Sequence, residues 1–179
     1  MYSQSATAQE IRLKPIGIIR TPFPKPTGTP VQPSRSGGAE GKVEVFPEYA
    51  DGLKDLDGFE RIWLIYWFDR AAESRLLVTP FLDDQKRGVF ATRAPTRPNA
   101  IGMSPVRLLK VAGRTLEVAD VDIVDGTPLI DIKPYLSEVD CHSVKKAGWF
   151  DQAARRRSVA DDRFTEKEQK RPRQGTKGK

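Results

Sequence analysis

The chain has 179 residues, a formal net charge of +6, one cysteine and one histidine. This length predicts a single domain with tails. One cysteine excludes an internal disulfide framework, and one cysteine with one histidine excludes a zinc site built from those ligands. No apolar run reaches the length of a membrane span, and the first ten residues lack the pattern of a signal peptide, so we expect a cytoplasmic protein with no membrane partner.

Most of the positive charge lies at the C-terminus. Residues 152–179 contain ten lysine or arginine side chains and four acidic ones, so the first 151 residues are neutral. A basic segment of this kind either contacts nucleic acid phosphates or only keeps the protein soluble. We expect residues 1–10 to form an N-terminal tail, residues 11–140 a folded domain, and residues 141–179 a polar, basic and partly disordered extension.

Hydrophobic patterns and turn signals predict seven strands and about one helix in the folded domain. A loop rich in proline and glycine is expected at residues 21–41, and the helix at residues 47–59. The strands are expected at residues 12–20, 42–46, 61–68, 88–92, 101–111, 115–124 and 128–135. The fifth and sixth of them form a hairpin. The expected fold is mainly β: a small closed or nearly closed antiparallel β-barrel with one or two short helices, the second within residues 143–157.

The loop that follows residue 92 carries the side chains best suited to binding an anion. The planar guanidinium groups of Arg93 and Arg97 donate paired hydrogen bonds to carboxylates and phosphates. Pro95 and Pro98 stiffen the backbone around them, which lowers the entropy cost of holding an arginine for a ligand. Asn99 adds an amide. The alternative interpretation is a structural turn with two solvated arginines.

Several common cofactor and metal motifs are absent from the sequence. Neither a dinucleotide-binding GxGxxG after a strand nor a phosphate-binding GxxxxGK[ST] occurs. Cys141 and His142 are adjacent, so their side chains diverge on an extended chain and do not form a nucleophile pair. Asp120, Asp122 and Asp125 lack the spacing of a calcium loop, so we expect no metal site.

The remaining candidates lie in a turn and in an aromatic strand. Asp125-Gly126 predicts a turn whose free backbone amides suit an adenine edge or a ribose, or else an ordinary β-turn. Trp63, Tyr66 and Trp67 have rings that stack on bases in other proteins, but so apolar a run favours core packing.

Six separate blocks, in order, resemble the TsaA-like, or TrmO, family of tRNA adenine-N6 methyltransferases. The blocks are IGIIRTP at 16–22, PVQP at 30–33, GVFATR at 88–93, RPNAIGMS at 97–104, VDGTP at 124–128 and DIKPYL at 131–136. The resemblance implies a small β-barrel that binds S-adenosylmethionine, forms a homodimer, and methylates N6 of threonylcarbamoyl-adenosine next to the anticodon of tRNA. Longer family members also carry a C-terminal domain with an Asp-Pro-Arg-Pro-x-Tyr motif. This sequence contains no such motif, and its basic segment stands in that place.

The resemblance also implies which residues bind the cofactor. These positions are Pro30, Gln32, Pro33, Asp69, Arg70, Arg93, Met103, Asp122, Ile123, Val124 and Asp125.

A direct, in-line methyl transfer fits these residues, because the cofactor carries the activated group and the protein mainly supplies position and electrostatics. We expect Arg93 to bind the carboxylate of the cofactor or of the substrate. Arg97 is a second arginine for a carboxylate-bearing substrate. Asn99 is a candidate for orienting the adenine edge, and the base for the N6 proton is Asp125 or solvent.

Two other functions fit the same sequence. One is a methyltransferase for a small carboxylate-bearing metabolite, which would not bind tRNA. The other is a non-catalytic module that binds RNA or senses the cofactor. Binding of tRNA and methyl incorporation separate the three hypotheses.

Overall fold

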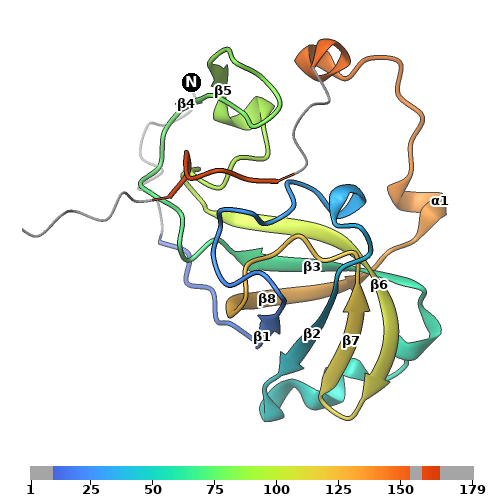
Figure 1. The fold of residues 1–179 in the computed structure, drawn as a ribbon. Helices are drawn as coiled ribbons and strands as arrows, with labels where there is room; N and C mark the ends of the chain where they lie inside the picture. The colour runs from blue at the N-terminus through green and yellow to red at the C-terminus, as the bar shows by residue number, and fades with distance from the viewer. Residues whose placement is uncertain (1–9, 154–158, 166–179) are drawn as a thin grey trace, which may run out of the picture.

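Six antiparallel strands close into a barrel in the computed structural model, which describes residues 10–153 and 159–165 (Figure 1). Around the barrel the strands follow the order β1-β2-β7-β6-β3-β8. Their bounds are β1 Gly17–Arg20, β2 Glu40–Val45, β3 Arg61–Trp67, β6 Ile101–Ala112, β7 Thr115–Ala119 and β8 Thr127–Pro134. The mainly β fold and the closed antiparallel barrel predicted from the sequence are therefore confirmed.

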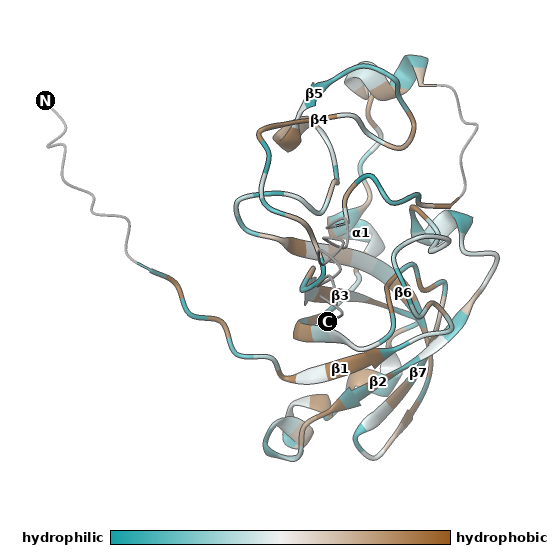
Figure 2. Cartoon of the chain, turned by 60° about the vertical axis from the view of Figure 1, so that its left-hand side comes forward, coloured by the Kyte–Doolittle hydropathy of each residue, from teal (hydrophilic) through white to brown (hydrophobic). Residues whose placement is uncertain are grey.

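The barrel interior is filled by alternate residues of the strands, as a period of two requires. In β3, Ile62, Leu64 and Tyr66 are buried, while Trp67 is exposed. β3 lies between β6 and β8, so the aromatic run is a central strand, and Trp63 packs outside the barrel against the ring of Tyr135. Figure 2 shows the hydrophobic stretches along β1, β3 and β6.

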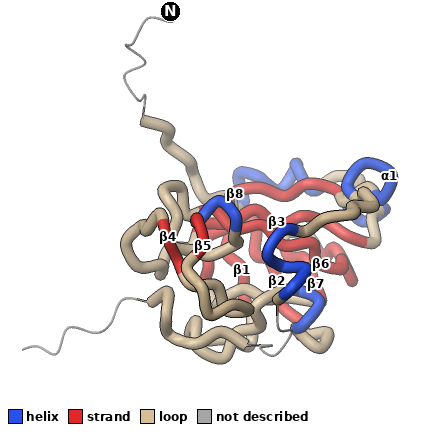
Figure 3. Tube along the Cα trace, turned by 90° about the horizontal axis from the view of Figure 1, so that it is seen from above, coloured by secondary structure: helices blue, strands red, loops and turns tan. Residues whose placement is uncertain are grey.

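The predicted strand at residues 88–92 is wrong. β4 (Leu77–Val78) and β5 (Arg87–Gly88) form a two-residue pair, and the chain then turns into a 3-10 helix over Val89–Ala91. The turn is closed by the Thr92 amide and hydroxyl, which both donate to the Val89 carbonyl. Figure 1 and Figure 3 place β4 and β5 to one side of the ring of strands.

The predicted helix at residues 47–59 is instead two 3-10 helices, Pro47–Leu53 and Leu56–Gly58. Asp55 interrupts them, because its φ of 64° lies in the left-handed region, outside a right-handed helix. Leu53 and Leu56 are nevertheless both buried, so the segment packs on the core through these two residues although it is not an α-helix.

Near the C-terminus the helical segments are short. A single α-helical turn, α1, spans Ser137–Asp140, and a 3-10 helix spans Gly148–Gln152 within the predicted 143–157. Residues 154–158 of that prediction lie outside the described residues. No helix in the described ranges is both long and apolar enough to cross a bilayer.

A second apolar cluster lies beside the barrel and involves the C-terminal extension. Val78, Val89 and Ala94 pack with the buried ring of Phe164. The segment Val159–Thr165, which we call the C-terminal strap, thus returns to the domain although it follows the expected boundary at residue 140. Of the ten basic side chains counted in residues 152–179, Arg163 is the one within the described part of the chain.

Candidate functional site

A cavity of about 310 Å³ lies where β3 ends and β6 begins. The loop at residues 21–41, the loops after β3 and β5, the turn between β7 and β8, and the C-terminal strap all contribute to its walls. Ten of the eleven residues implied as cofactor-binding line it: Pro30, Gln32, Pro33, Asp69, Arg70, Arg93, Met103, Asp122, Ile123 and Val124. The structure therefore brings together residues that are up to 94 positions apart in the sequence. We call this space the first cavity.

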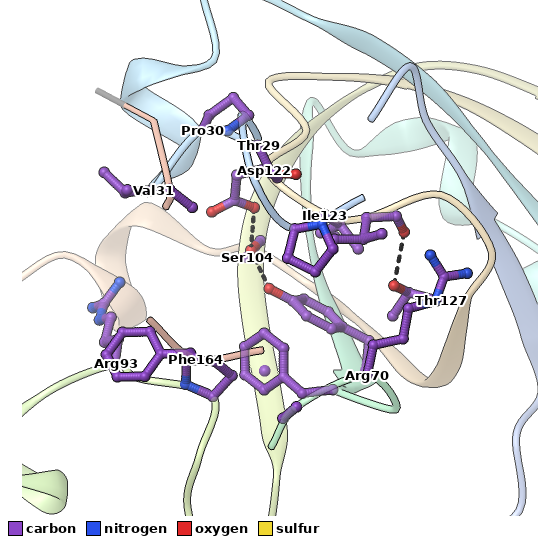
Figure 4. A pocket seen from close by; sticks show the side chains of 18 of the residues that line it. Thr29, Pro30, Val31, Arg70, Arg93, Ser104, Asp122, Ile123, Thr127 and Phe164 are labelled. Carbon is purple, nitrogen blue, oxygen red and sulfur yellow. Dashed lines mark hydrogen bonds between the residues drawn. The ribbon is translucent and has the colours of Figure 1, made fainter. Parts of the chain in front are cut away.

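A chain of polar groups runs from the barrel interior to the wall of the first cavity (Figure 4). The Ser104 hydroxyl donates to Asp122 Oδ1 at 2.6 Å, and the Tyr66 hydroxyl lies 3.1 Å from Ser104 Oγ. Because the single hydroxyl proton of Ser104 goes to the carboxylate, Tyr66 must be the donor to Ser104. Tyr66 and Ser104 are buried, so the chain fixes the Asp122 carboxylate at one place on the cavity wall.

The surroundings of Asp122 change its ionisation. Burial raises the pKa of the Asp122 carboxyl to about 6, although the Ser104 hydrogen bond and the nearby Arg93 charge oppose the rise. Burial also raises the pKa of the Tyr66 phenol, so this group stays protonated. Asp122 is therefore a carboxylate at neutral pH that still lacks a strong cationic partner, which is the arrangement that a cationic ligand would stabilise.

The raised pKa of Asp122 makes the folding stability of the protein depend on pH. Between pH values of about 4 and 6 the native carboxyl binds a proton that the unfolded chain has lost, so this group's stabilising contribution is present at low pH and disappears as pH rises. The loss amounts to at most about 3 kcal/mol. Asp122→Asn should therefore gain melting temperature relative to the wild type as pH rises from 4 to 7. Parallel melting temperatures across that range would contradict the raised pKa.

Arg93 is placed to meet a negatively charged ligand. It is exposed, it lines the first cavity, and it makes no hydrogen bond or ion pair within residues 10–153 and 159–165. Figure 4 shows its guanidinium apart from the Asp122–Ser104–Tyr66 chain. The sequence prediction that this arginine is held for a carboxylate agrees with that position, but no bound group tests it.

The other two arginines of the site hold loops together. Arg97 Nη1 donates to the carbonyls of Thr92 and Ala94 within its own loop. Arg70 donates to the carbonyl of Pro24 in the first long loop and to that of Asp125 in the β7–β8 turn. Both side chains line the first cavity, but these bonds make them supports of the wall as well as candidates for ligand contact.

Two predicted residues lie outside the first cavity. The carboxylate of Asp125 accepts the Thr21 backbone N–H at 3.0 Å, so it closes the turn over the long loop rather than facing a ligand. Asn99 is exposed and contributes its backbone carbonyl to a bond with the Ile101 amide. The proposed roles of Asp125 as a base and of Asn99 in orienting adenine therefore gain no support from the geometry.

Gly102, in the block at 97–104, leaves space that two neighbouring rings occupy. A Cβ atom there would overlap the ring of Tyr66 and lie 2.8 Å from Phe68 Cζ. The missing side chain allows Tyr66 to pack flat against β6, where its hydroxyl meets Ser104. Gly102 thus supports the polar chain through space rather than through backbone freedom.

The C-terminal strap is the part of the site that the sequence analysis missed. Ala160 exchanges backbone hydrogen bonds with Gly28 and Thr29 of the first long loop. Arg163 donates to the carbonyls of Thr79 and Pro80 and to Asp161, so its charge is used inside the fold. The signal was present in the sequence, because Phe164 is the one aromatic residue of segment 152–179.

Phe164 should control how firmly the strap closes the site. Its ring lies 5.0 Å from that of Phe81 in an edge-on contact and lines the first cavity. Phe164→Ala removes a buried ring, a change that costs about 3–5 kcal/mol where the site cannot collapse. We expect faster hydrogen exchange over residues 77–94, with the barrel strands still protected. Val144→Ala, at a residue 72% exposed in the same extension, is the control. Equal exchange in both variants would show that the strap does not stabilise this region.

The three aspartates considered for a metal do not form a cluster. Asp120 pairs with Arg61 and Arg107, Asp122 with Ser104, and Asp125 with Thr21. Among the described residues, no group of three or more potential ligands comes together to hold a metal ion.

The fold and the site define a small β-barrel with a cavity at one end, walled by loops and carrying both a carboxylate and a guanidinium that is unpaired among the described residues. The family model for the tRNA-methyltransferase O N-terminal domain matches residues 18–141, and the chain belongs to this family. It is 50% identical over 149 residues to a probable S-adenosyl-L-methionine-binding protein of Pyrococcus abyssi, covering 83% of this chain and 81% of that one.

Two further relatives are longer than this chain. A mouse tRNA (adenine(37)-N6)-methyltransferase is 35% identical over 140 residues, which is 74% of this chain and 32% of the mouse protein. A crystal structure of TrmO from Pseudomonas aeruginosa superposes with a TM-score of 0.69 at 34% identity, covering 82% of this chain and 64% of that one. The chain thus spans about a third of the mouse enzyme and under two thirds of the solved TrmO chain.

Proposed function

We propose that this protein is an S-adenosylmethionine-dependent methyltransferase that acts on N6 of an adenine in tRNA. Membership of the tRNA-methyltransferase O family supports the proposal, as do relatives named for binding S-adenosylmethionine and for methylating adenine 37 of tRNA. The observation that carries it is that the Asp122 carboxylate and the exposed Arg93 guanidinium both line one cavity.

The residues of the first cavity fit S-adenosylmethionine. The cofactor has a sulfonium cation, a carboxylate and an adenosine, and a cavity of about 310 Å³ is of the size that holds small ligands. Asp122 offers a partly desolvated negative charge for the cation, and Arg93 a guanidinium for the carboxylate. Phe68, Phe81 and Phe164 give the wall apolar surface for a nucleoside.

The cofactor supplies a methyl group already activated on positively charged sulfur. When bound, it would pass this methyl group to N6 with the electron pair left on sulfur, and the N6 proton would go to water. Asp122 attracts a charge that is lost during transfer, so it contributes to binding of the reactant rather than to lowering the barrier. The remaining residues act by position: the Tyr66–Ser104 chain fixes Asp122, and the strap excludes water.

The finer substrate that we propose is threonylcarbamoyl-adenosine. This modified base carries a carboxylate, and Arg93 lies exposed at the cavity wall with no ion pair among the described residues. The carboxylate that Arg93 binds belongs either to this base or to the cofactor. The two sources share one chemistry, and a single substitution distinguishes them.

Arg93→Ala tests the function and the source of the carboxylate together. The wild type should incorporate labelled methyl groups into tRNA that carries the threonylcarbamoyl group, and much more weakly into tRNA that lacks it. A charge-assisted hydrogen bond contributes about 1.5–3 kcal/mol, so the variant should lose affinity for the carboxylate-bearing ligand by a factor of about ten or more. If calorimetry shows that loss for S-adenosylmethionine, Arg93 binds the cofactor; if the loss is confined to transfer to modified tRNA, it binds the substrate. No incorporation by the wild type into either tRNA contradicts the proposed activity.

We also propose that the protein functions as a homodimer through the outer face of β3 and β6. Trp67 and Ile101 are paired across these strands and are 49% and 41% exposed; Ile101 and Met103 (53% exposed) also line the first cavity, so this face borders it. An apolar surface of this kind is typical of a contact between copies.

Sedimentation tests the dimer. The wild type should sediment with twice the 20.0 kDa mass of the chain, and Trp67→Glu should convert it to the monomer. Leu109→Glu is the matched control, because Leu109 is similarly exposed (46%) farther along β6. A monomeric wild type, or a variant that stays dimeric, would contradict this interface.

A further inference from the structure

A second cavity of about 580 Å³ adjoins the first. The two adjoin, because they have six lining residues in common: Val31, Gln32, Phe81, Thr92, Arg93 and Phe164. None of the residues that the family resemblance assigns to the cofactor lines the second cavity except Gln32 and Arg93.

The walls of the second cavity are aromatic and stay open to solvent. Phe90, on the 3-10 helix Val89–Ala91, is 75% exposed and packs in neither apolar cluster. Trp149 is fixed opposite by a hydrogen bond from Nε1 to the Ala91 carbonyl at 2.7 Å. Trp149 and Phe150 are in edge-on contact, and the Arg87 guanidinium lies 5.9 Å from the Trp149 ring centre. Trp149 is thus held in place by its hydrogen bond, and the ring of Phe90 remains outside both apolar clusters.

The charges around the second cavity favour an anionic partner. Arg93 lies in its wall, and Lys145 and Lys146 directly precede the lining residue Ala147. The charges of Arg87 and Asp83 cancel in an ion pair, which leaves Arg93, Lys145 and Lys146 against the carboxylate of Asp151, itself bonded to the Ala147 amide. Exposed aromatic rings combined with basic side chains are the usual means of binding unpaired nucleobases and their phosphates.

We propose that the second cavity is the binding site for the acceptor base, where one unpaired adenine of an RNA loop stacks on Phe90 and Trp149. This inference rests on the proposed function, since the base must lie next to the cofactor cavity to accept a methyl group. The accepting N6 atom has to reach the methyl carbon in the first cavity, and the second cavity adjoins it and has both stacking surfaces and a basic rim. Enzymes that act on a base must take it out of its stack, and aromatic walls offset that cost.

A fluorescent RNA tests the proposal without relying on catalysis. A synthetic anticodon stem-loop with 2-aminopurine in place of the acceptor adenine loses emission when that base stacks on an aromatic ring. The wild type should quench the emission on binding. Phe90→Ala should bind this RNA about tenfold or more weakly and quench less, because a stacked ring is lost. Its affinity for S-adenosylmethionine, measured by calorimetry, should be unchanged.

Two further variants make the result specific. Phe90→Tyr keeps a stacking face and should restore binding and quenching. Leu76→Ala removes another exposed apolar side chain, 65% exposed and outside both cavities, and should behave as the wild type. If Phe90→Ala binds and quenches like the wild type, while the wild type still methylates tRNA, the base site is refuted and the proposed function stands. If the wild type neither binds the stem-loop nor methylates tRNA, both fall.

Discussion

The hydrogen bond from Ser104 to the half-buried carboxylate of Asp122 is the interaction on which the site depends. It ties an inward position of β6 to the segment after β7, so the barrel fixes the carboxylate. Tyr66 completes the chain from β3, and Gly102 leaves the room that its ring needs. A carboxylate held in this way cannot move toward solvent to relieve its desolvation. A cation bound beside it would offset the part of the desolvation that the Ser104 hydrogen bond leaves, and this gives the cavity its preference.

The loops around this fixed point are joined to one another by arginines and by the strap. Arg70 links the first long loop to the β7–β8 turn, Arg97 braces the proline-rich loop, and Arg163 anchors the strap over Thr79 and Pro80. Each of these guanidinium groups donates hydrogen bonds to backbone carbonyls of the loops, and Arg163 donates to the Asp161 carboxylate as well. Arg93 differs because its guanidinium is not used in this way, and it lies where the two cavities meet.

The sequence predicted the barrel because residues alternate in the segments of β2, β6 and β7, β3 is a continuous apolar run, and β6 and β7 are joined by a short turn. Ten of the eleven positions that the family resemblance implies for the cofactor line one cavity. The sequence prediction failed where tertiary contacts override local pattern: Val89–Ala91 looks like a strand but turns so that Val89 enters the second cluster, and residues 47–59 look helical but bend at Asp55. The strap could not be placed, because nothing local says that Phe164 packs 83 residues back, on Phe81. For Asp125 and Asn99, composition suggested chemistry that the geometry assigns to turn structure.

The most direct test of this account is calorimetric binding of S-adenosylmethionine and of its demethylated product, whose sulfur is neutral, at pH 5 and pH 7.5. Ionised Asp122 should favour the sulfonium, so affinity for S-adenosylmethionine should rise by about tenfold between these pH values, as a group with a pKa of about 6 loses its proton. Affinity for the neutral product should not follow. No measurable uptake of S-adenosylmethionine, or an identical pH dependence for both compounds, would contradict the role assigned to the carboxylate.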